Sequence, residues 1–137
     1  MPYFGRTSTE RLNTCHEDLK IVFNEVVRDY DCTIICGHRG KHAQTMAYEM
    51  GKSKVQWPNS NHNSQPSRAV DVGPWPLDWS DHGAFYMLAG WVLCTAERLH
   101  KMGRISHRIR YGGDWNSNHS TKDQRFHDLP HFELVKD

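Results

Sequence analysis

Two long stretches of helical hydrophobic spacing constrain the fold of this chain most. Apolar residues recur at helical period through residues 8–29, where Thr7 and Glu10 have the spacing of a capping box. A second pattern predicts a helix at about 81–102, with Asp81 or the serine before it as the N-cap. Helices of this length bury one apolar face, so the rest of the chain must supply a surface for them to cover.

Short apolar runs of β type supply that surface. They lie at 32–36, 69–72, 109–111 and 131–135. A shorter helix is expected at 42–50, and polar loops at 52–68 and 112–127. The predicted fold is therefore α+β: a single domain over residues 1–137, with a small, mainly antiparallel sheet and helices packed on one face.

Charge and composition exclude several classes of protein. The 17 Lys and Arg residues nearly balance the 16 Asp and Glu residues, so there is no global charge to recruit nucleic acid or an anionic membrane. No apolar run approaches the ~20 residues of a membrane span, and the N-terminus lacks the apolar region of a signal peptide. The four cysteines form no CxxC pair and are expected to be free thiols, mostly buried.

Two segments concentrate the groups that a hydrolytic zinc site needs. Such a site takes three ligands from His, Asp or Glu, leaves one position open, and needs a base and an oxyanion partner. The first segment runs from Ser60 through His62 to Asp71, and the second from His127 to Glu133. Taken alone, a solvated His62 and a structurally paired Asp71 are the ordinary explanations, and the second segment is no more than suggestive, so the residues by themselves leave a metal site open.

These segments resemble a known family. His62 with Ser60 before it, then Pro-Ser-Arg-Ala-Val-Asp71, then Asp128-x-x-His131-Phe-Glu-Leu resemble the zinc D-Ala-D-Ala-type carboxypeptidases and dipeptidases. The greatest likeness is to the bacteriophage L-alanyl-D-glutamate endopeptidases that act as endolysins. The step from His62 to Asp71 is nine residues, longer than in the family's usual Ser-x-His-x-x-Gly-x-Ala-x-Asp motif. The resemblance implies the fold that this family shares with hedgehog domains.

The resemblance also implies roles for individual residues. His62, Asp71 and His131 resemble the ligands of one zinc ion. Asp128 resembles the catalytic carboxylate that takes a proton from the attacking water and passes it to the leaving amine. Arg39, just after the first predicted strand, resembles the arginine that stabilises the oxyanion.

Further residues are expected around this site. Glu133 is two residues from His131, so on a strand both side chains point to one side. Glu133 is therefore a candidate to accept a hydrogen bond from the ring nitrogen of His131 that does not bind the metal. Ser60 is expected to orient its loop. Ser60, Trp75, Tyr111 and Trp115 are candidates for contact with the substrate.

A second cation is considered in the loop that begins at Asp114. Asp114, Asn116 and Asn118 alternate as at the start of a calcium loop. His119 stands where an EF-hand has glycine, and Arg125 where it has glutamate, so an EF-hand is rejected and only a weak regulatory cation is retained.

The expected function is hydrolysis of a cell-wall peptide bond, most simply L-Ala-D-Glu, through a zinc-activated water. The alternatives are a D-Ala-D-Ala carboxypeptidase or dipeptidase with the same metal site, and a non-catalytic zinc-binding module. The implied partner is the peptidoglycan stem peptide. The chain is expected to be a monomer that stays in the bacterial cytoplasm until a separate holin releases it to the wall.

Overall fold

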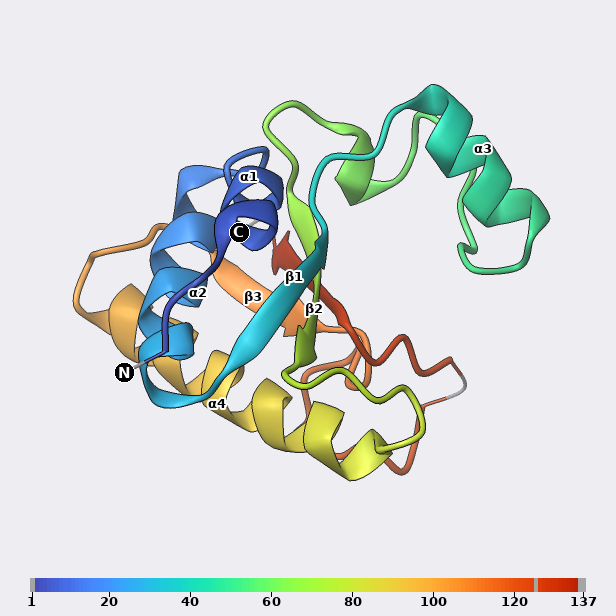
Figure 1. The fold of residues 1–137 in the computed structure, drawn as a ribbon. Coiled ribbons are helices and arrows are strands. Elements are labelled where there is room, and N and C mark those ends of the chain that lie inside the picture. Colours follow the sequence, from blue (N-terminus) through green and yellow to red (C-terminus); the bar gives the residue numbers. More distant parts are fainter. Residues whose placement is uncertain (1, 125, 136–137) are drawn as a thin grey trace.

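The computed structural model describes residues 2–124 and 126–135 (Figure 1). In chain order its elements are α1 (Arg6–Leu12), α2 (Glu17–Asp29), β1 (Cys32–Cys36), α3 (Lys41–Glu49), the short 3₁₀ helix η1 (Asn61–Asn63), β2 (Ala69–Pro74), α4 (His82–Lys101), β3 (Arg108–Tyr111) and β4 (His131–Val135). The strands form one sheet in the order β1-β2-β4-β3, and every neighbouring pair is antiparallel. The predicted α+β class is confirmed.

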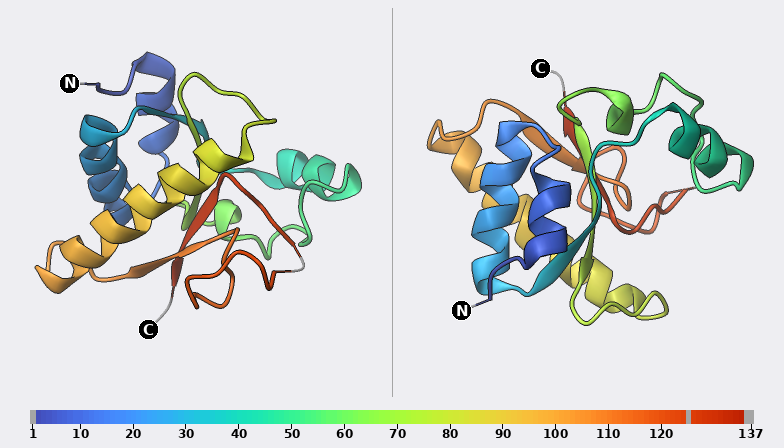
Figure 2. Two further views of the ribbon diagram at one scale, coloured as in Figure 1. Left: turned by 90° about the horizontal axis from the view of Figure 1, so that it is seen from below. Right: turned by 45° about the horizontal axis from the view of Figure 1, so that its top comes forward.

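One face of the sheet carries the hydrophobic core. Val70 and Val72 of β2 and Phe132 and Leu134 of β4 are buried on this face, as strand alternation requires. Helices α2 and α4 pack against each other, α4 also contacts β2 and β3, and α1 contacts β1. Figure 2 shows these three helices on one side of the sheet. The opposite face is left open to the loops that build the site.

The two long helices bury the stripes that their sequences predict. In α2 the stripe is Leu19, Val22, Phe23, Val26 and Val27; in α4 it is Phe85, Leu88, Ala89, Val92, Ala96 and Leu99. Asp81 is the N-cap of α4, where its side chain accepts from the backbone N–H of Ala84. Each fully buried leucine or phenylalanine stabilises the fold by roughly 1.5–3 kcal/mol, so these stripes fix the helices on the sheet.

The single helix expected at 8–29 is wrong. The chain forms α1 and α2 instead, and α1 starts after Gly5 without a side-chain cap, so the Thr7 and Glu10 capping box is not used. Between the helices, Cys15 forms an isolated bridge to Ser67, a residue far along the chain. His16 then caps α2, its Nδ1 accepting from the backbone N–H of Asp18. This long-range pairing competes with helix continuation, and local hydrophobic spacing does not report it.

Helix α3 departs from the expectation that the helices share one face. It stands away from the other helices, beyond the end of β1 (Figure 1). Gln44 is its buried residue and is fully enclosed, while most of the helix is exposed. We call residues 41–55, from the start of α3 through the turn after it, the α3 arm.

The cysteines are free, as expected: Cys15 and Cys32 are buried, Cys36 is half-buried and Cys94 is exposed. Among the described residues, no helix has the length and apolar character that crossing a bilayer requires.

Candidate metal centre and active-site cleft

Three of the predicted site residues meet on the open face of the sheet. Asp71 of β2 and His131 of β4 are direct cross-strand partners, so both side chains project to the same side. η1 brings His62 over them. The Oδ1 atom of Asp71 lies 3.3 Å from Nε2 of His62 and 3.3 Å from Nδ1 of His131. The three candidate ligand atoms all lie within 4.8 Å of one another.

The second nitrogen of each histidine ring is fixed by another acceptor. Nδ1 of His62 lies 2.7 Å from the carbonyl oxygen of Gly37, which can only accept, so Nδ1 carries a hydrogen. Nε2 of His131 lies 2.7 Å from Oε1 of Glu133 and likewise donates. The remaining nitrogens, Nε2 of His62 and Nδ1 of His131, both face Asp71. Each ring therefore turns one free nitrogen toward the same point.

The charge of the Asp71 carboxylate favours a positive charge where the three side chains meet. Burial alone lowers the pKa of both histidines, but contact with Asp71 outweighs it and raises the pKa of His62 to about 10 and of His131 to about 9. Burial likewise opposes the charge on Asp71, yet the two histidines hold the pKa of its carboxyl far below the usual range. Without a cation, protons take its place.

A metal ion fits the residues present. Nε2 of His62 is buried and makes no well-formed hydrogen bond within the described residues, although Oδ1 of Asp71 lies 3.3 Å away. Two neutral imidazole nitrogens and one carboxylate oxygen are a donor set that zinc accepts in catalytic sites. A metal ion at this point would bind this nitrogen directly and take the place of the proton between it and Asp71. His62, Asp71 and His131 therefore form a candidate metal-binding site.

The other His and Asp group in the described residues is built differently. Oδ2 of Asp18 accepts from the backbone N–H groups of Ser106 and His107 and lies 2.7 Å from Nδ1 of His107. Nδ1 of His16 is occupied as the cap of α2. These contacts tie the turn before β3 to α2, so this second group has a structural role.

Arg39 lies beside the candidate metal centre, at the end of β1. Its Nη2 is 3.4 Å from Oδ2 of Asp71, and its Nη1 donates to Oε1 of Gln44 at 3.1 Å. The backbone N–H of Arg39 donates to the carbonyl oxygen of His62 at 2.7 Å, which ties η1 to the end of β1. Arg39 is thus a partly buried cation held on two sides, as an oxyanion partner must be.

Asp128 lies on the other side of the centre, in the tight turn that leads into β4. Its Oδ2 is 3.9 Å from Nδ1 of His131. Burial and the nearby charge of Asp71 raise the pKa of Asp128 to about 6. Gly112 permits this turn, because a Cβ there would lie 2.2 Å from the carbonyl oxygen of Asp128 and 2.9 Å from Cβ of His131. A carboxyl with a pKa near neutrality suits proton transfer.

Glu133 and two neighbours support His131. Glu133 is buried, and Arg110 of β3 donates to its Oε2 from both Nε and Nη2. The ring of Trp115 lies 5.5 Å from the ring of His131, and its Nε1 donates to the carbonyl oxygen of Phe126 at 2.8 Å. The predicted contact between Glu133 and His131 is therefore present, and Arg110 extends it across the sheet.

A cleft of about 1240 Å³ surrounds the centre. The α3 arm forms one wall and residues 126–131 form another. Of the predicted substrate residues, Ser60 and Trp115 line the cleft, and Ser60 also accepts from the backbone N–H of His62.

Trp75 and Tyr111 do not line the cleft. Trp75 follows the end of β2 that pairs with the start of β1, away from Asp71, and is exposed. Tyr111 is buried against Phe132 on the core face of the sheet. Trp79, Gln44, Arg110 and Phe126 do contribute to the cleft or its support but were not predicted from sequence. For Arg110 the sequence did offer a signal: alternation along a strand places Arg110 and Tyr111 on opposite faces of the sheet, so only one of them can face the cleft.

The loop after Asp114 is organised by its own side chains. Asp114 is buried, and its oxygens accept from the backbone N–H groups of Asn118 and His119. Asp123 accepts from the side-chain amides of Asn116 and Asn118. His119 has a φ of 66°, the left-handed conformation that an EF-hand reserves for glycine.

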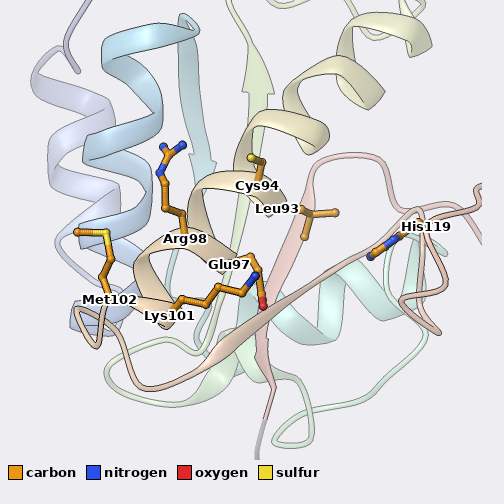
Figure 3. Close-up of a pocket in the computed structure, with 7 residues that line it drawn as sticks. All are labelled: Leu93, Cys94, Glu97, Arg98, Lys101, Met102 and His119. Atoms are coloured by element: carbon orange, nitrogen blue, oxygen red, sulfur yellow. The ribbon is translucent and has the colours of Figure 1, made fainter.

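A smaller depression of about 550 Å³ lies between the C-terminal half of α4 and His119 (Figure 3). Its lining combines the exposed Cys94 with Leu93, Arg98 and other side chains of α4, and with Met102 just after that helix. Neither of the two clusters of His and Asp side chains that could hold a metal ion in the described residues lies in this depression. The cleft on the open face of the sheet is therefore the better candidate for an active site.

Comparison with known proteins identifies the family. A family model described as phage L-alanyl-D-glutamate peptidase matches residues 2–135. The chain belongs to this family. A phage L-alanyl-D-glutamate peptidase is a hydrolase, so the predicted class of enzyme and the predicted resemblance are confirmed.

Solved structures give the same fold. The crystal structure of the Serratia marcescens L-Ala D-Glu endopeptidase ChiX matches with a TM-score of 0.73 and 24% sequence identity. The match covers 97% of this chain and 90% of that one. No curated protein sequence matches the chain. This member of the phage L-alanyl-D-glutamate peptidase family thus shares the arrangement of helices and sheet over nearly its whole length.

Proposed function

We propose that this chain is a zinc-dependent endolysin that hydrolyses the L-Ala-D-Glu bond of the peptidoglycan stem peptide. The observation that carries the proposal is the convergence of His62, Asp71 and His131 on one point, with Arg39 and Asp128 beside it. A purely structural metal site needs neither a base nor an oxyanion partner. Membership of the phage family supports the choice of bond.

His62, Asp71 and His131 would hold the metal, through Nε2, Oδ1 and Nδ1 respectively. Zinc at this position would act as a Lewis acid and lower the pKa of a water molecule. Glu133 keeps His131 oriented by accepting from Nε2.

Asp128 and Arg39 carry the remaining chemistry. Asp128 accepts a proton from the attacking water and returns it to the leaving amine of D-glutamate, a transfer worth about 10²–10⁴-fold in rate. The guanidinium of Arg39 donates to the carbonyl oxygen as negative charge develops there. Gln44 and Asp71 hold that guanidinium from two sides, so it needs no reorganisation during the reaction.

Two alternatives are separable by experiment. A D-Ala-D-Ala carboxypeptidase or dipeptidase would use the same residues, and digestion of muropeptides followed by mass spectrometry distinguishes the two. A new L-Ala terminus supports the endopeptidase, and loss of terminal D-Ala supports the carboxypeptidase. A non-catalytic zinc-binding module would leave every muropeptide intact.

The assigned roles are tested by Asp128→Ala. We expect this variant to bind zinc with the wild-type stoichiometry and to lose about 10²–10⁴-fold in kcat. Full activity would overturn the mechanism, and loss of zinc would instead move Asp128 into the ligand set. His42→Ala, on the exposed face of α3, is the matched control and should behave as wild type.

A weak regulatory cation in the loop after Asp114 is a further part of the proposal. The carboxylates of Asp114 and Asp123 and the amide oxygens of Asn116 and Asn118 support it, since hard cations take oxygen ligands. Calcium titration of the zinc-loaded enzyme tests it: activity or tryptophan fluorescence should change in wild type and not in Asp123→Asn.

Membership of the phage family also supports a proposal about where the reaction takes place. We propose that the chain acts as a monomer on the cell wall after release from the host cytoplasm by a separate holin. Sedimentation of the purified chain tests the first point. Lysis on co-expression with a holin, and its absence without one, tests the second.

A further inference from the structure

The cleft contains a cation that the proposed reaction does not use. Lys54, on the α3 arm, lines the cleft, and its Nζ lies over the ring of Phe126, 5.1 Å from the ring centre. Such a contact holds an ammonium group in a preferred place at an exposed site. Lys54 therefore reaches across from one wall of the cleft to the other.

The backbone that carries Lys54 is fixed by a buried side chain. Nε2 of Gln44 donates to Oγ of Ser53 at 2.9 Å and to the carbonyl oxygen of Val55 at 2.8 Å. The backbone N–H of Ser53 donates to Ala47 of α3. The residues on both sides of Lys54 are thus anchored to the same glutamine that holds Arg39, so the lysine keeps a defined position relative to the reacting groups.

Charge pairing leaves Lys54 available for a ligand. Arg39 is paired with Asp71, and Arg110 with Glu133. Within residues 2–124 and 126–135, no carboxylate forms an ion pair with Lys54. The free charge of this wall of the cleft is positive, which favours an anionic group on the substrate.

The substrate carries such a group on the appropriate side. When L-alanine is joined to the amine of D-glutamate and the chain continues through one of its two carboxyl groups, the other carboxyl is left as an anion. That amine is the leaving group, and Asp128 protonates it. Phe126, over which Lys54 lies, is two residues before Asp128 on the same wall.

We propose that Lys54 is a specificity-determining residue whose ammonium group binds the free carboxylate of the D-glutamate residue. This inference rests on the proposed function and names the contact by which the cleft selects its substrate. Lys54 would then favour stem peptides with a free carboxylate over those in which the same group is amidated.

The test compares two substrates in four proteins. Muropeptides that differ only in a free or amidated glutamate carboxyl are cleaved by wild type, Lys54→Met, Lys54→Arg and Lys41→Met. Methionine keeps the length and apolar contacts of the lysine stem, and Lys41 is an exposed lysine of the same arm outside the cleft lining. We expect wild type to prefer the acid about five- to tenfold in kcat/KM, mostly through KM.

The preference should fall to about one in Lys54→Met and persist in Lys54→Arg and Lys41→Met. An unchanged preference in Lys54→Met, or an equal loss on both substrates, overturns the inference and leaves the proposed function intact. Failure of wild type to cleave either substrate overturns the proposed function itself.

Discussion

Zinc binding should release about two protons per chain at pH 7. In the metal-free site, His62 has a pKa of about 10 and His131 of about 9, so both carry a proton at neutral pH, whereas Asp71 does not. A metal ion needs the neutral imidazoles and must displace both protons. Two ordinary histidines with a pKa of about 6.5 would together release only about half a proton at pH 7. The raised pKa values therefore change the expected count about fourfold.

The same linkage sets the pH dependence of zinc affinity. Because the folded-state pKa values are raised, the protonated form persists up to about pH 9, and affinity falls as pH decreases below that value. Between pH 6 and 8 the logarithm of the apparent association constant should rise by about two per pH unit. Above pH 9, where His131 has lost its proton, the slope should approach one. Ordinary histidines would give a slope well below one at pH 7 and near zero at pH 8.

Calorimetry measures the count directly. Zinc is titrated into the metal-free protein at pH 7 in buffers of different ionisation enthalpy, and the dependence of the heat on the buffer gives the number of protons released. His42→Ala should release the same number as wild type. Ionisation of a bound water could only add to the count. A release of half a proton or less would refute the electrostatic picture of the site.

Three further predictions concern the residues around the centre. The kcat/KM should fall as pH drops through about 6 or somewhat lower, because Asp128 must be ionised to accept a proton and a bound metal would bring its raised pKa down from about 6. A pH–rate profile without an acidic limb above pH 4 would contradict this role. Gln44→Ala should lower the free energy of unfolding by about 2–3 kcal/mol in urea denaturation, since it leaves the partners of a buried amide unpaired, whereas the exposed Thr45→Ala should change it little. Gly112→Ala should weaken zinc binding by about 10–100-fold in a chelator competition, because its Cβ displaces the turn that precedes His131; wild-type affinity would show that the turn can adjust.

The sheet and long helices were predictable because local pattern determines them. Strand β4 begins and ends where the apolar run does, and α4 starts after the acidic cap that its sequence offers. The break between α1 and α2 was not predictable, because it depends on a bridge from Cys15 to Ser67. The hydrophobic spacing continues through the break, so a periodicity argument has no means of detecting it.

The candidate metal ligands were predictable from the sequence, but the residues that hold the site in place were not. His62, Asp71 and His131 were singled out by their resemblance to the motifs of the family, since the residues alone left a structural role open. Gln44 occupies an ordinary position in a short polar helix, and only the folded chain buries it against Arg39 and Ser53. Trp75 was expected to contact the substrate, but it follows the end of β2 that is distant from Asp71.

The pairing of β2 with β4 makes the long step from His62 to Asp71 unimportant for the proposed metal site. Asp71 and His131 are set opposite each other by the backbone ladder, and His62 is fixed separately, through Arg39 and Gly37 at the end of β1. Residues 64–66 therefore span two anchored ends, because Asn63 on one side donates to the carbonyl oxygen of Arg39 and the backbone N–H of Arg68 on the other donates to Asn61. Insertions or deletions at residues 64–66 should change the length of the loop and leave the ligand atoms in place, which makes this segment the natural point at which to graft a new substrate-contacting loop.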